Sequence, residues 1–441
     1  MRWFLGASVL LTLGLMFRLG LMVYAMYVLL AVLLVSRYLA RAWIENLSAN
    51  RSASGSTVEI GETVAVTLTI CNRSRLPIPW MLLEDSIPRE AITQKPPRIT
   101  IKGRTLHIIQ LTGRSETQLD YLVNCLMRGY YQLGPLLVES GDLFGLQRRY
   151  KVLTEPHFLL VMPKIVPLEG YDLASRLPIG EVRMTHRLFE DPTRISGIRP
   201  YEKGDPLNRV HWRATARTGS LQSKLYDPSS ISGATFLLDF HRDSYPSRGQ
   251  LYRSELAVTT VASLANVVHQ MGQQVGFITN GRDMADRIRQ EGWTPEFHTR
   301  ALAKAQVGML DQNDRLRPVI VQTRRGTDQF MRILEILARI ELTDGIKFPQ
   351  LVEETASRLP RNASIVAVLS DVEDETAIAL GGLRRRGYAV TAVLAMFDEE
   401  QHPEWASKPE WASWLLAAGV EVRRVDDEAA LSSLCAKQLI R

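Results

Sequence analysis

The stretch ATFLLDFHRDS, residues 234–244, decides the fold of the C-terminal half of this chain. A short apolar run ends at Asp239, and the polar loop His241-Arg242-Asp243-Ser244 follows it. Such a run is typical of a buried strand in a parallel sheet. The next segment, RSELAVTTVASLANVVHQMG (253–272), places apolar residues at helical spacing and closes with Gly272. Together they predict a strand followed by a helix.

The same alternation continues to the C-terminus. Further strand-like runs cover 273–281, 363–371, 388–397 and 420–425, and helix-like runs cover 327–342, 348–360, 375–387 and 411–419. Strands that alternate with helices predict a doubly wound α/β domain over residues 234–441. Sites in such sheets lie beyond the carboxyl ends of the strands, where Asp239 and Asp371 both fall. The weak periodicity of residues 281–317 predicts loop and short helix.

A different pattern precedes this domain. STVEIGETVAVTLTICNRS (56–74) alternates apolar and polar residues with Gly61 at a turn, and residues 105–146 continue in short runs bounded by Gly, Ser and Asp. Period two over short runs is typical of half-buried antiparallel strands. We therefore predict an all-β, immunoglobulin-like sandwich over residues 44–163. Residues 164–233 form a connector.

The N-terminus is almost free of charge. From Trp3 to Val35 the one charged residue is Arg18. A spanning helix needs about 20 apolar residues, so this stretch is long for one span and short for two. We predict a transmembrane helical hairpin over residues 1–43 with Arg18-Leu19-Gly20 at its turn; the alternative is one tilted helix with Arg18 reaching the headgroups.

The basic residues that flank the hairpin predict its orientation. Arg2 precedes it, and Arg37 and Arg41 follow. Because basic flanks favour the cytoplasmic side, both ends and the whole soluble part are expected in the cytoplasm. A single span would place the soluble part outside if the N-terminus stays in. The expected localisation is the cell membrane, with two spans.

Composition and motifs exclude several classes of function. The net charge of +6 over 441 residues does not indicate a nucleic-acid partner. None of the three cysteines lies in a CxxC pair, so no zinc cluster is expected. Cys71 and Cys125 are expected to be buried free thiols; the alternative is a disulfide between them in an oxidising compartment. We find no GxSxG, HExxH or Walker A motif, and we do not expect an enzyme.

One segment is chemically distinctive: RPYEKGDPLNRVHWRATARTGSLQSKLYDP, residues 199–228. It closely resembles the signature of the DUF58 family, and RGYYQLGPLLVESGDLFGL (128–146) resembles a second motif of that family. The residues of this segment that we take as binding or signature positions are Arg199, Tyr201, Gly204, Asp205, Arg209, His211, Trp212, Arg213 and Arg217. This chain has a threonine, Thr215, at a position of the signature where the family usually has serine.

The resemblance implies more than the residues do. DUF58 proteins typically carry two membrane helices, a β-rich segment and a von Willebrand factor A-like domain, and they often occur beside a MoxR-type AAA+ ATPase. We accordingly expect a bacterial, integral membrane protein with that ATPase as its partner and no nucleic-acid partner. The expected function is a membrane-tethered adaptor or assembly factor. The alternatives are a metal-dependent hydrolase that uses Asp239 and Asp371, and a metal-free structural scaffold.

The acids at the strand ends resemble the ion-binding loops of von Willebrand factor A domains. That family uses a D-x-S-x-S loop, a threonine and a later aspartate, whereas His241 and Asp243 stand here at the two serine positions. The resemblance implies a Mg²⁺ site at Asp239, Asp243, Thr327 and Asp371. The altered loop favours the alternative, in which no cofactor binds and the acids cap helices.

The arginines of the signature leave three interpretations open. Arg209, Arg213 and Arg217 are spaced by four, so on a helix they share one face and need acidic or phosphate partners. They brace two domains through ion pairs, or meet a protein partner, or meet nucleic acid or lipid headgroups. Trp212 is expected to be buried, and His211 to form a hydrogen bond.

Overall fold

The computed structural model describes residues 2–17, 20–142, 148–168, 190–201, 210–228, 233–245, 249–285, 316–360, 364–395 and 411–432. The described chain divides into two compact units, one containing residues 2–162 and the other beginning at Pro163. We describe each unit by itself.

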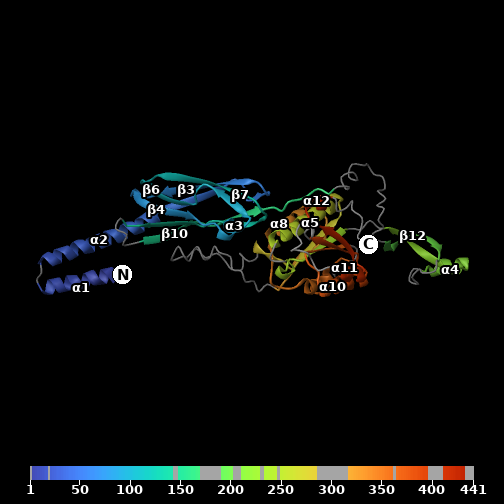
Figure 1. Ribbon diagram of the computed structural model, residues 1–441. Coiled ribbons are helices and arrows are strands. Elements are labelled where there is room, and N and C mark those ends of the chain that lie inside the picture. Colours follow the sequence, from blue (N-terminus) through green and yellow to red (C-terminus); the bar gives the residue numbers. More distant parts are fainter. Residues whose placement is uncertain are drawn as a thin grey trace. The chain divides into compact units, whose positions relative to one another are not determined.

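Two helices open the first unit. α1 (Arg2–Met16) packs against α2 (Gly20–Glu45), as Figure 1 shows. At about 1.5 Å per residue α1 is shorter than a bilayer core of about 30 Å. Within the described part of the chain, α2 is the one helix long and apolar enough to cross a membrane. The predicted turn at Arg18 and Leu19 lies outside the described residues.

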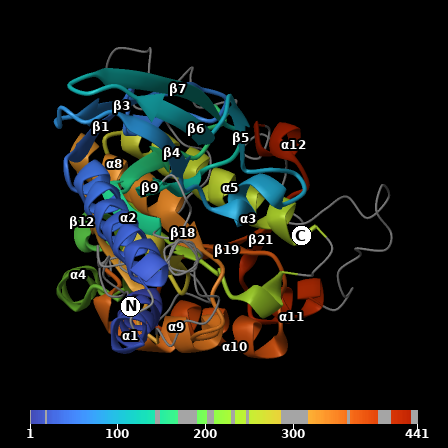
Figure 2. The same cartoon turned by 90° about the vertical axis from the view of Figure 1, so that its left-hand side faces the viewer.

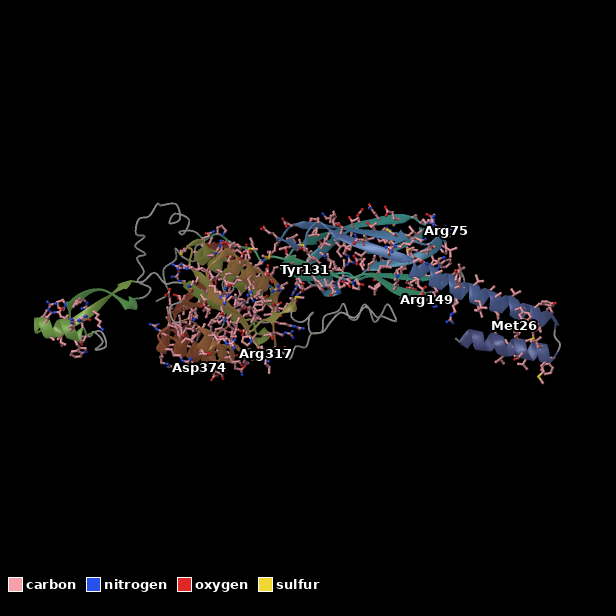
Figure 3. The ribbon with its side chains drawn as sticks, turned by 180° about the vertical axis from the view of Figure 1, so that it is seen from behind. Met26, Arg75, Tyr131, Arg149, Arg317 and Asp374 are labelled. Atoms are coloured by element: carbon pink, nitrogen blue, oxygen red, sulfur yellow. The ribbon has the colours of Figure 1, made fainter. Side chains whose placement is uncertain are left out.

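The apolar side chains of α2 largely face outward (Figure 3). Leu21 is 90% exposed and Tyr24 is 74% exposed. Burial begins only towards the end of the helix, at Ser36, Ala40, Trp43 and Ile44. An apolar helix with this exposure needs a surrounding such as lipid, whereas its last turns belong to a protein core.

The last turns of α2 belong to the core of the β-rich unit. Trp43 and Leu47 join the apolar cluster between its sheets. The Lys151 ammonium group donates hydrogen bonds to the carbonyl oxygens of Ile44, Glu45 and Leu47, at 3.3, 3.1 and 2.9 Å. Ile44 and Glu45 end α2, where carbonyl groups have no intrahelical donor, and Leu47 begins β1 (Leu47–Ala53). Lys151 therefore supplies donors to the end of the helix and to the start of the strand that follows.

The β-rich unit is sandwich-like, as the alternating pattern predicted. One antiparallel sheet has the order β1 (Leu47–Ala53), β3 (Thr63–Asn72), β7 (Glu116–Cys125), β5 (Ile99–Lys102), and another has β10 (Arg148–Thr154), β9 (Leu136–Gly141), β4 (Ile78–Asp85), β6 (Leu106–Leu111). A third sheet joins β2 (Thr57–Val58), β11 (His157–Val161) and β8 (Gly129–Leu133), and α3 (Arg89–Thr93) is a short helix. Every second residue of β3 from Val64 to Asn72 is buried. Cys71 and Cys125 are free thiols.

The second unit includes a β-hairpin and a six-stranded sheet. The hairpin pairs β12 (Glu190–Pro200) with β13 (Gln222–Pro228), and α4 (Trp212–Thr218) precedes β13. The sheet has the order β17 (Val319–Arg324), β15 (Gln274–Thr279), β14 (Gly233–Leu238), β19 (Ser364–Leu369), β20 (Val390–Ala395), β21 (Glu421–Val425). Every neighbouring pair is parallel except β15 and β17, which are antiparallel.

Helices cover both faces of this sheet (Figure 2). α5 (Gln250–Gln270) packs on β14, β15, β19 and β20, and α8 (Thr327–Arg339) packs beside it. On the other face lie α9 (Phe348–Thr355), α10 (Asp374–Arg385) and α11 (Trp411–Ala417), and α12 (Glu428–Ser432) follows β21. The short elements η2 (Arg242–Ser244), β16 (Arg282–Asp283), β18 (Ile340–Glu341) and η3 (Ala356–Arg358) connect them. This arrangement places the ends of β14 and β19 side by side.

Candidate functional site

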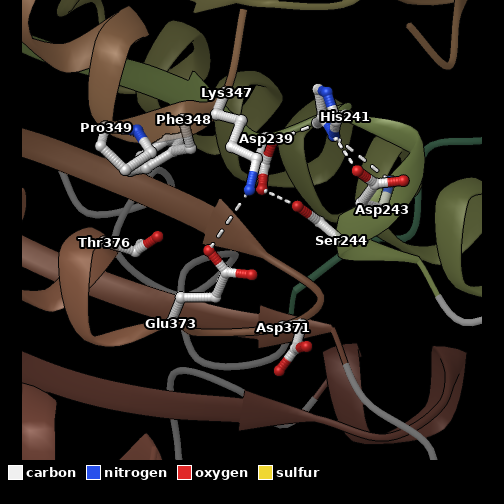
Figure 4. Close-up of a pocket in the computed structure, with 10 residues that line it drawn as sticks. All are labelled: Asp239, His241, Asp243, Ser244, Lys347, Phe348, Pro349, Asp371, Glu373 and Thr376. Atoms are coloured by element: carbon white, nitrogen blue, oxygen red, sulfur yellow. Dashed lines mark hydrogen bonds and ion pairs between the residues drawn. The ribbon is translucent and has the colours of Figure 1, made fainter. Parts of the chain in front are cut away.

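A small pocket lies at the carboxyl ends of β14 and β19. Its lining comes from the loop after β14, the start of α9 and the segment from Asp371 into α10 (Figure 4). The lining residues are Asp239, His241, Asp243, Ser244, Lys347, Phe348, Pro349, Asp371, Glu373 and Thr376. The pocket encloses about 20 Å³. This volume holds a water molecule or a small ion and no organic substrate.

Asp239 forms the floor of the pocket and is 2% exposed. One carboxylate oxygen accepts hydrogen bonds from the His241 backbone N–H at 3.1 Å and from the Asn280 amide at 2.9 Å, and the other accepts from the Ser244 hydroxyl at 2.6 Å. Burial raises the pKa of Asp239, and the Ser244 and Asn280 hydrogen bonds oppose this rise. Both oxygens are therefore already engaged by the protein.

A buried frame holds the Asp239 loop in place. The Tyr245 hydroxyl donates to the Asp239 carbonyl oxygen at 2.7 Å, and the Asn280 side chain accepts from the Phe240 N–H at 2.7 Å. Thr343, 2% exposed, exchanges backbone hydrogen bonds with this loop, donating to Phe240 and accepting from Arg242. The loop is thus rigidly supported from β15 and from the segment after β18.

The rim of the pocket is charged and accessible. The Lys347 ammonium group lies 3.8 Å from a Glu373 carboxylate oxygen (Figure 4), and both side chains are about half exposed. The Asp243 side chain is 74% exposed and its carboxylate lies 3.7 Å from His241 Nδ1. The Asp371 carboxylate accepts from the Val372 N–H at 2.8 Å. The site therefore combines a sealed acid with a rim that a partner can reach.

The structure brings three of the four predicted ion-site residues together. Asp239, Asp243 and Asp371 line the same pocket, but Thr327 does not. Thr327 begins α8 directly after β17, and β17 runs antiparallel, so Arg324 pairs with Val275 at the start of β15. Thr327 therefore lies near the amino ends of the parallel strands, whereas the three acids lie at their carboxyl ends. The predicted grouping of Thr327 with these acids is wrong.

The donor set does not fit a divalent cation. Across the part of the chain that the structure describes, no group of three or more His, Cys, Asp or Glu side chains is arranged to hold a metal ion. Both Asp239 oxygens accept hydrogen bonds from the protein, and the Lys347 ammonium group lines the same pocket. A nearby ammonium group repels a divalent cation, and Mg²⁺ demands near-ideal octahedral oxygen geometry.

Sequence reasoning missed four contributors to the site: Ser244, Asn280, Thr343 and Lys347. Ser244 follows Asp239 within the quoted loop, and Asn280 follows the second strand, so their places at strand ends carried a signal. Thr343 and Lys347 lie in the segment between α8 and α9, where no periodic pattern in the sequence indicates their positions.

The signature segment forms a second candidate surface on the hairpin and α4. The His211 ring nitrogen Nδ1 caps α4 by accepting from the Ala214 N–H at 3.0 Å, so the expected hydrogen bond of His211 is present. Trp212 is 67% exposed, and its predicted burial is wrong. It is the first residue of α4, whose packed side is instead formed around Thr215, the acceptor of the Gln222 N–H.

The other signature residues divide into described and undescribed ones. Arg213 and Arg217 lie on α4 and are exposed, and within the described chain neither forms an ion pair. Arg199 and Tyr201 lie at the end of β12, where the Tyr201 N–H donates to the Leu221 carbonyl. Gly204, Asp205 and Arg209 lie outside the described residues.

Residues 197–295 match the family model described as "Protein of unknown function DUF58". The chain is also 23% identical over 271 residues to the uncharacterized protein YeaD of Bacillus subtilis (strain 168), a match that covers 61% of this chain. The chain spans 65% of the length of that relative. Both matches support the DUF58 family that the signature indicated.

Solved structures give only distant likenesses. The CARDB domain of a Pyrococcus furiosus protein is 12% identical with a TM-score of 0.17, and the match covers 26% of this chain and 91% of that domain. Proximal thread matrix protein 1 from the mussel byssus is 8% identical with a TM-score of 0.29, covering 47% of this chain and 46% of that protein. Scores this low support no inference about function.

Proposed function

We propose that this chain is a membrane-tethered protein-interaction adaptor that contacts its partner with the rim of the strand-end pocket. The observation that carries this proposal is the contrast between a sealed floor and an open rim. Asp239 is enclosed and both of its carboxylate oxygens accept hydrogen bonds, whereas Asp243, Lys347 and Glu373 present accessible charges around it. A rigid, charged rim suits recognition of another protein's side chains.

The size of the pocket favours an adaptor over a hydrolase. Sites for small-molecule substrates commonly enclose about 300–1,000 Å³, and this pocket encloses about 20 Å³. Asp239 and Asp371 both line it, but the Asp239 oxygens are occupied by Ser244, Asn280 and the His241 N–H. A metal-dependent hydrolytic site would need those oxygens for the ion.

The fold supports a structural class for each of the two domains, as part of the same proposal. We propose a von Willebrand factor A-like class for the six-stranded sheet and an immunoglobulin-like class for the sandwich. The acids beyond the carboxyl ends of β14 and β19 support the former. The anchor is proposed, on the family resemblance, as a two-span hairpin with the soluble units in the cytoplasm. Because α1 is shorter than the bilayer core, this topology needs the bilayer to thin around α1. The proposed partner, on the same resemblance, is a MoxR-type AAA+ ATPase.

Site-specific crosslinking tests the rim directly. A photoreactive amino acid replaces the exposed Asp243 at the pocket, and in a matched protein it replaces the exposed Asp328 on α8, next to Thr327. We expect membranes of the native host to yield a crosslinked AAA+ ATPase from position 243 and not from position 328. Equal products from both positions, or none from position 243, would refute the rim as the contact face.

A charge reversal tests whether the charges of the rim contribute to binding, in addition to where the partner lies. Glu373→Lys keeps the fold, because the Glu373 side chain is 57% exposed, but it places a second cation beside Lys347. We expect the crosslink from position 243 to be lost in this variant, since like charges across an interface are strongly unfavourable. An unchanged crosslink would show that the rim charges do not contribute.

A further inference from the structure

A second surface remains outside this function: the hairpin tip, defined as residues 197–201 and 210–224. Within it α4 buries none of its side chains. Trp212 is 67% exposed, Ile198 48% and Leu221 44%. A tryptophan this exposed on a short, capped helix leaves a large apolar surface in water.

The tip is built to present these side chains. His211 caps the start of α4, and Gly219 ends it in the left-handed conformation with φ +70°, its N–H donating to the Thr215 carbonyl. The Thr215 hydroxyl accepts from the Gln222 N–H at 3.0 Å, which ties the helix to β13. The inner side of α4 is therefore fixed to the strand, and Trp212, Arg213 and Arg217 are left on the outer side.

The described residues 197–201 and 210–224 carry side-chain charges of one sign. They include four cations, Arg199, Arg213, Arg217 and Lys224, and no Asp or Glu. Ile198 pairs with Lys224 across the hairpin, so an apolar and a basic side chain share one face there. Exposed aromatic and aliphatic groups beside cations match a surface that is anionic outside and apolar beneath.

We propose that the hairpin tip binds the surface of an anionic lipid bilayer. Trp212 lies at the boundary between headgroups and acyl chains, where tryptophan is enriched, and Arg213 and Arg217 contact lipid phosphates with their planar guanidinium groups. Clusters of Lys and Arg near a membrane are attracted to anionic lipids. The binding is independent of the strand-end rim and rests on the membrane tether only for proximity.

The tether favours lipid over other acidic partners. With α2 as the proposed tether, the chain stays at a bilayer, so headgroups are present at a high effective concentration, and even a weak contact is then populated. Free phosphate offers the arginines a partner but no apolar layer for Trp212, Ile198 and Leu221. The bilayer surface offers partners both to the arginines and to the exposed apolar side chains of the tip.

Lipid quenching of a local fluorophore tests the proposal on the full chain. The native cysteines are replaced (Cys71→Ser, Cys125→Ala, Cys435→Ser), and an environment-sensitive dye is attached at Ala216→Cys on α4. The protein is reconstituted in vesicles of brominated phosphatidylcholine, with and without phosphatidylglycerol. A second protein carries the dye at Glu353→Cys, an exposed position of α9. We expect quenching at position 216 in the phosphatidylglycerol vesicles alone, lost at high salt, and no quenching at position 353.

Two variants check the roles of the side chains. Replacing Arg213 and Arg217 together by glutamine should lower the ratio of lipid-bound to free tip about 30-fold. This corresponds to about 1 kcal/mol of binding free energy for each arginine, converted at tenfold for every 1.4 kcal/mol. Trp212→Ala should lower quenching while leaving its dependence on phosphatidylglycerol. All three side chains are exposed, so these variants are expected to fold, and circular dichroism checks this.

Three outcomes would overturn the proposal. They are no quenching at position 216, equal quenching in both lipids, and equal quenching at positions 216 and 353. Competition by inorganic phosphate at constant ionic strength, or a crosslink from position 216 to a protein in native membranes without lipid quenching, would assign the tip to those partners instead. Resistance of the chain to carbonate extraction is measured in parallel, so that failure of the tether is distinguished from failure of the tip, and the crosslink from position 243 reports separately on the rim.

Discussion

Asp239 carries a carboxyl group that the fold encloses almost completely. Burial raises its pKa above the unfolded value of about 4, so the folded chain binds this proton more tightly than the unfolded chain does. Its stabilising contribution is complete below the unfolded pKa and is lost as pH rises through the folded-state pKa. The site therefore costs stability at neutral pH.

Replacing this carboxyl group by an amide should remove that cost. We expect Asp239→Asn to gain stability over the wild type as pH rises from about 4 to 7, by about 1.4 kcal/mol for each unit of raised pKa. The amide can donate to the Ser244 hydroxyl, which now donates to Asp239. Thermal unfolding of the full chain in detergent at several pH values measures this, with the exposed Asp243→Asn as control. A difference that does not change with pH would show that Asp239 has no raised pKa.

Lys347 supplies a positive charge to the same pocket. If this ammonium group takes the place of a cation, Mg²⁺ should not raise the unfolding temperature of the wild-type chain. A ligand at 100 times its Kd would stabilise the fold by about 2.7 kcal/mol, a shift that is easily measured. Lys347→Met is the companion variant. Stabilisation of the wild type by Mg²⁺ that Asp239→Asn abolishes would contradict our view of the donor set.

A second buried acid lies in the sandwich. Asp85 is 2% exposed, forms an ion pair with Arg51 and accepts from the Tyr121 hydroxyl at 2.6 Å. Asp85→Ala leaves the Arg51 charge buried without its carboxylate, and we expect a loss of about 3–5 kcal/mol. Tyr121→Phe removes one hydrogen bond to a charged group and should cost about 1.5–3 kcal/mol.

The buried Cys125 offers a probe for that prediction. Burial raises the pKa of its thiol to about 11, so the folded chain holds it as an unreactive thiol. With Cys71 and Cys435 replaced by serine, the rate of maleimide labelling in urea reports opening of the sandwich. Equal labelling of the Asp85→Ala and Tyr121→Phe proteins would show that the ion pair adds nothing to the hydrogen bond.

At the scale of elements, α2 is continuous with the domain that follows it. Lys151 of β10 donates to the carbonyl oxygens of Ile44 and Glu45 at the end of α2 and of Leu47 at the start of β1, and Trp43 packs in the sandwich core. Lys151→Met keeps the length of the side chain but removes these donors. We expect a loss of about 1–2 kcal/mol in local stability, seen as faster amide hydrogen exchange over residues 39–47. Lys102→Met, at the exposed end of β5, is the matched control. Equal exchange rates in the two variants would show that the Lys151 hydrogen bonds do not stabilise the end of α2.

Element patterns decided how much of the fold was predictable. The alternation from Val64 to Ile70 fixed which side of β3 is buried, because one face of a sheet meets the core and the other meets water. β17 was not among the predicted strands, and its antiparallel direction was not predictable either, because that direction is set by pairing with β15. For that reason the acids after β14 and β19 were placed together correctly, and Thr327 was not. Local periodicity reports burial, whereas strand direction depends on contacts distant in sequence.

At the scale of the whole molecule, the exposed side chain of Trp212 shows a further limit of sequence reasoning. A tryptophan in a mixed segment is usually buried, yet α4 turns Thr215 inward because this hydroxyl bonds β13. The composition of the signature thus indicated a special surface but not which side chains it exposes. The proposed membrane tether and the hairpin tip are separate features of one chain, and each has its own test.

The orientation of the chain is the prediction on which a cytosolic partner depends. Arg37 and Arg41 lie in the last third of α2, after its most exposed apolar part, and basic residues after a span favour the cytoplasmic side. We expect an alkaline phosphatase fused to the C-terminus to be inactive, because that enzyme matures only outside the cytoplasm. Replacing both arginines by glutamate should raise its activity by inverting part of the population, whereas Arg73→Glu with Arg75→Glu, both exposed in the sandwich, should not. An active fusion in the wild type would place the soluble units outside and remove a cytosolic ATPase as partner. The rim and the hairpin tip would then have to find their partners on the outer side of the membrane.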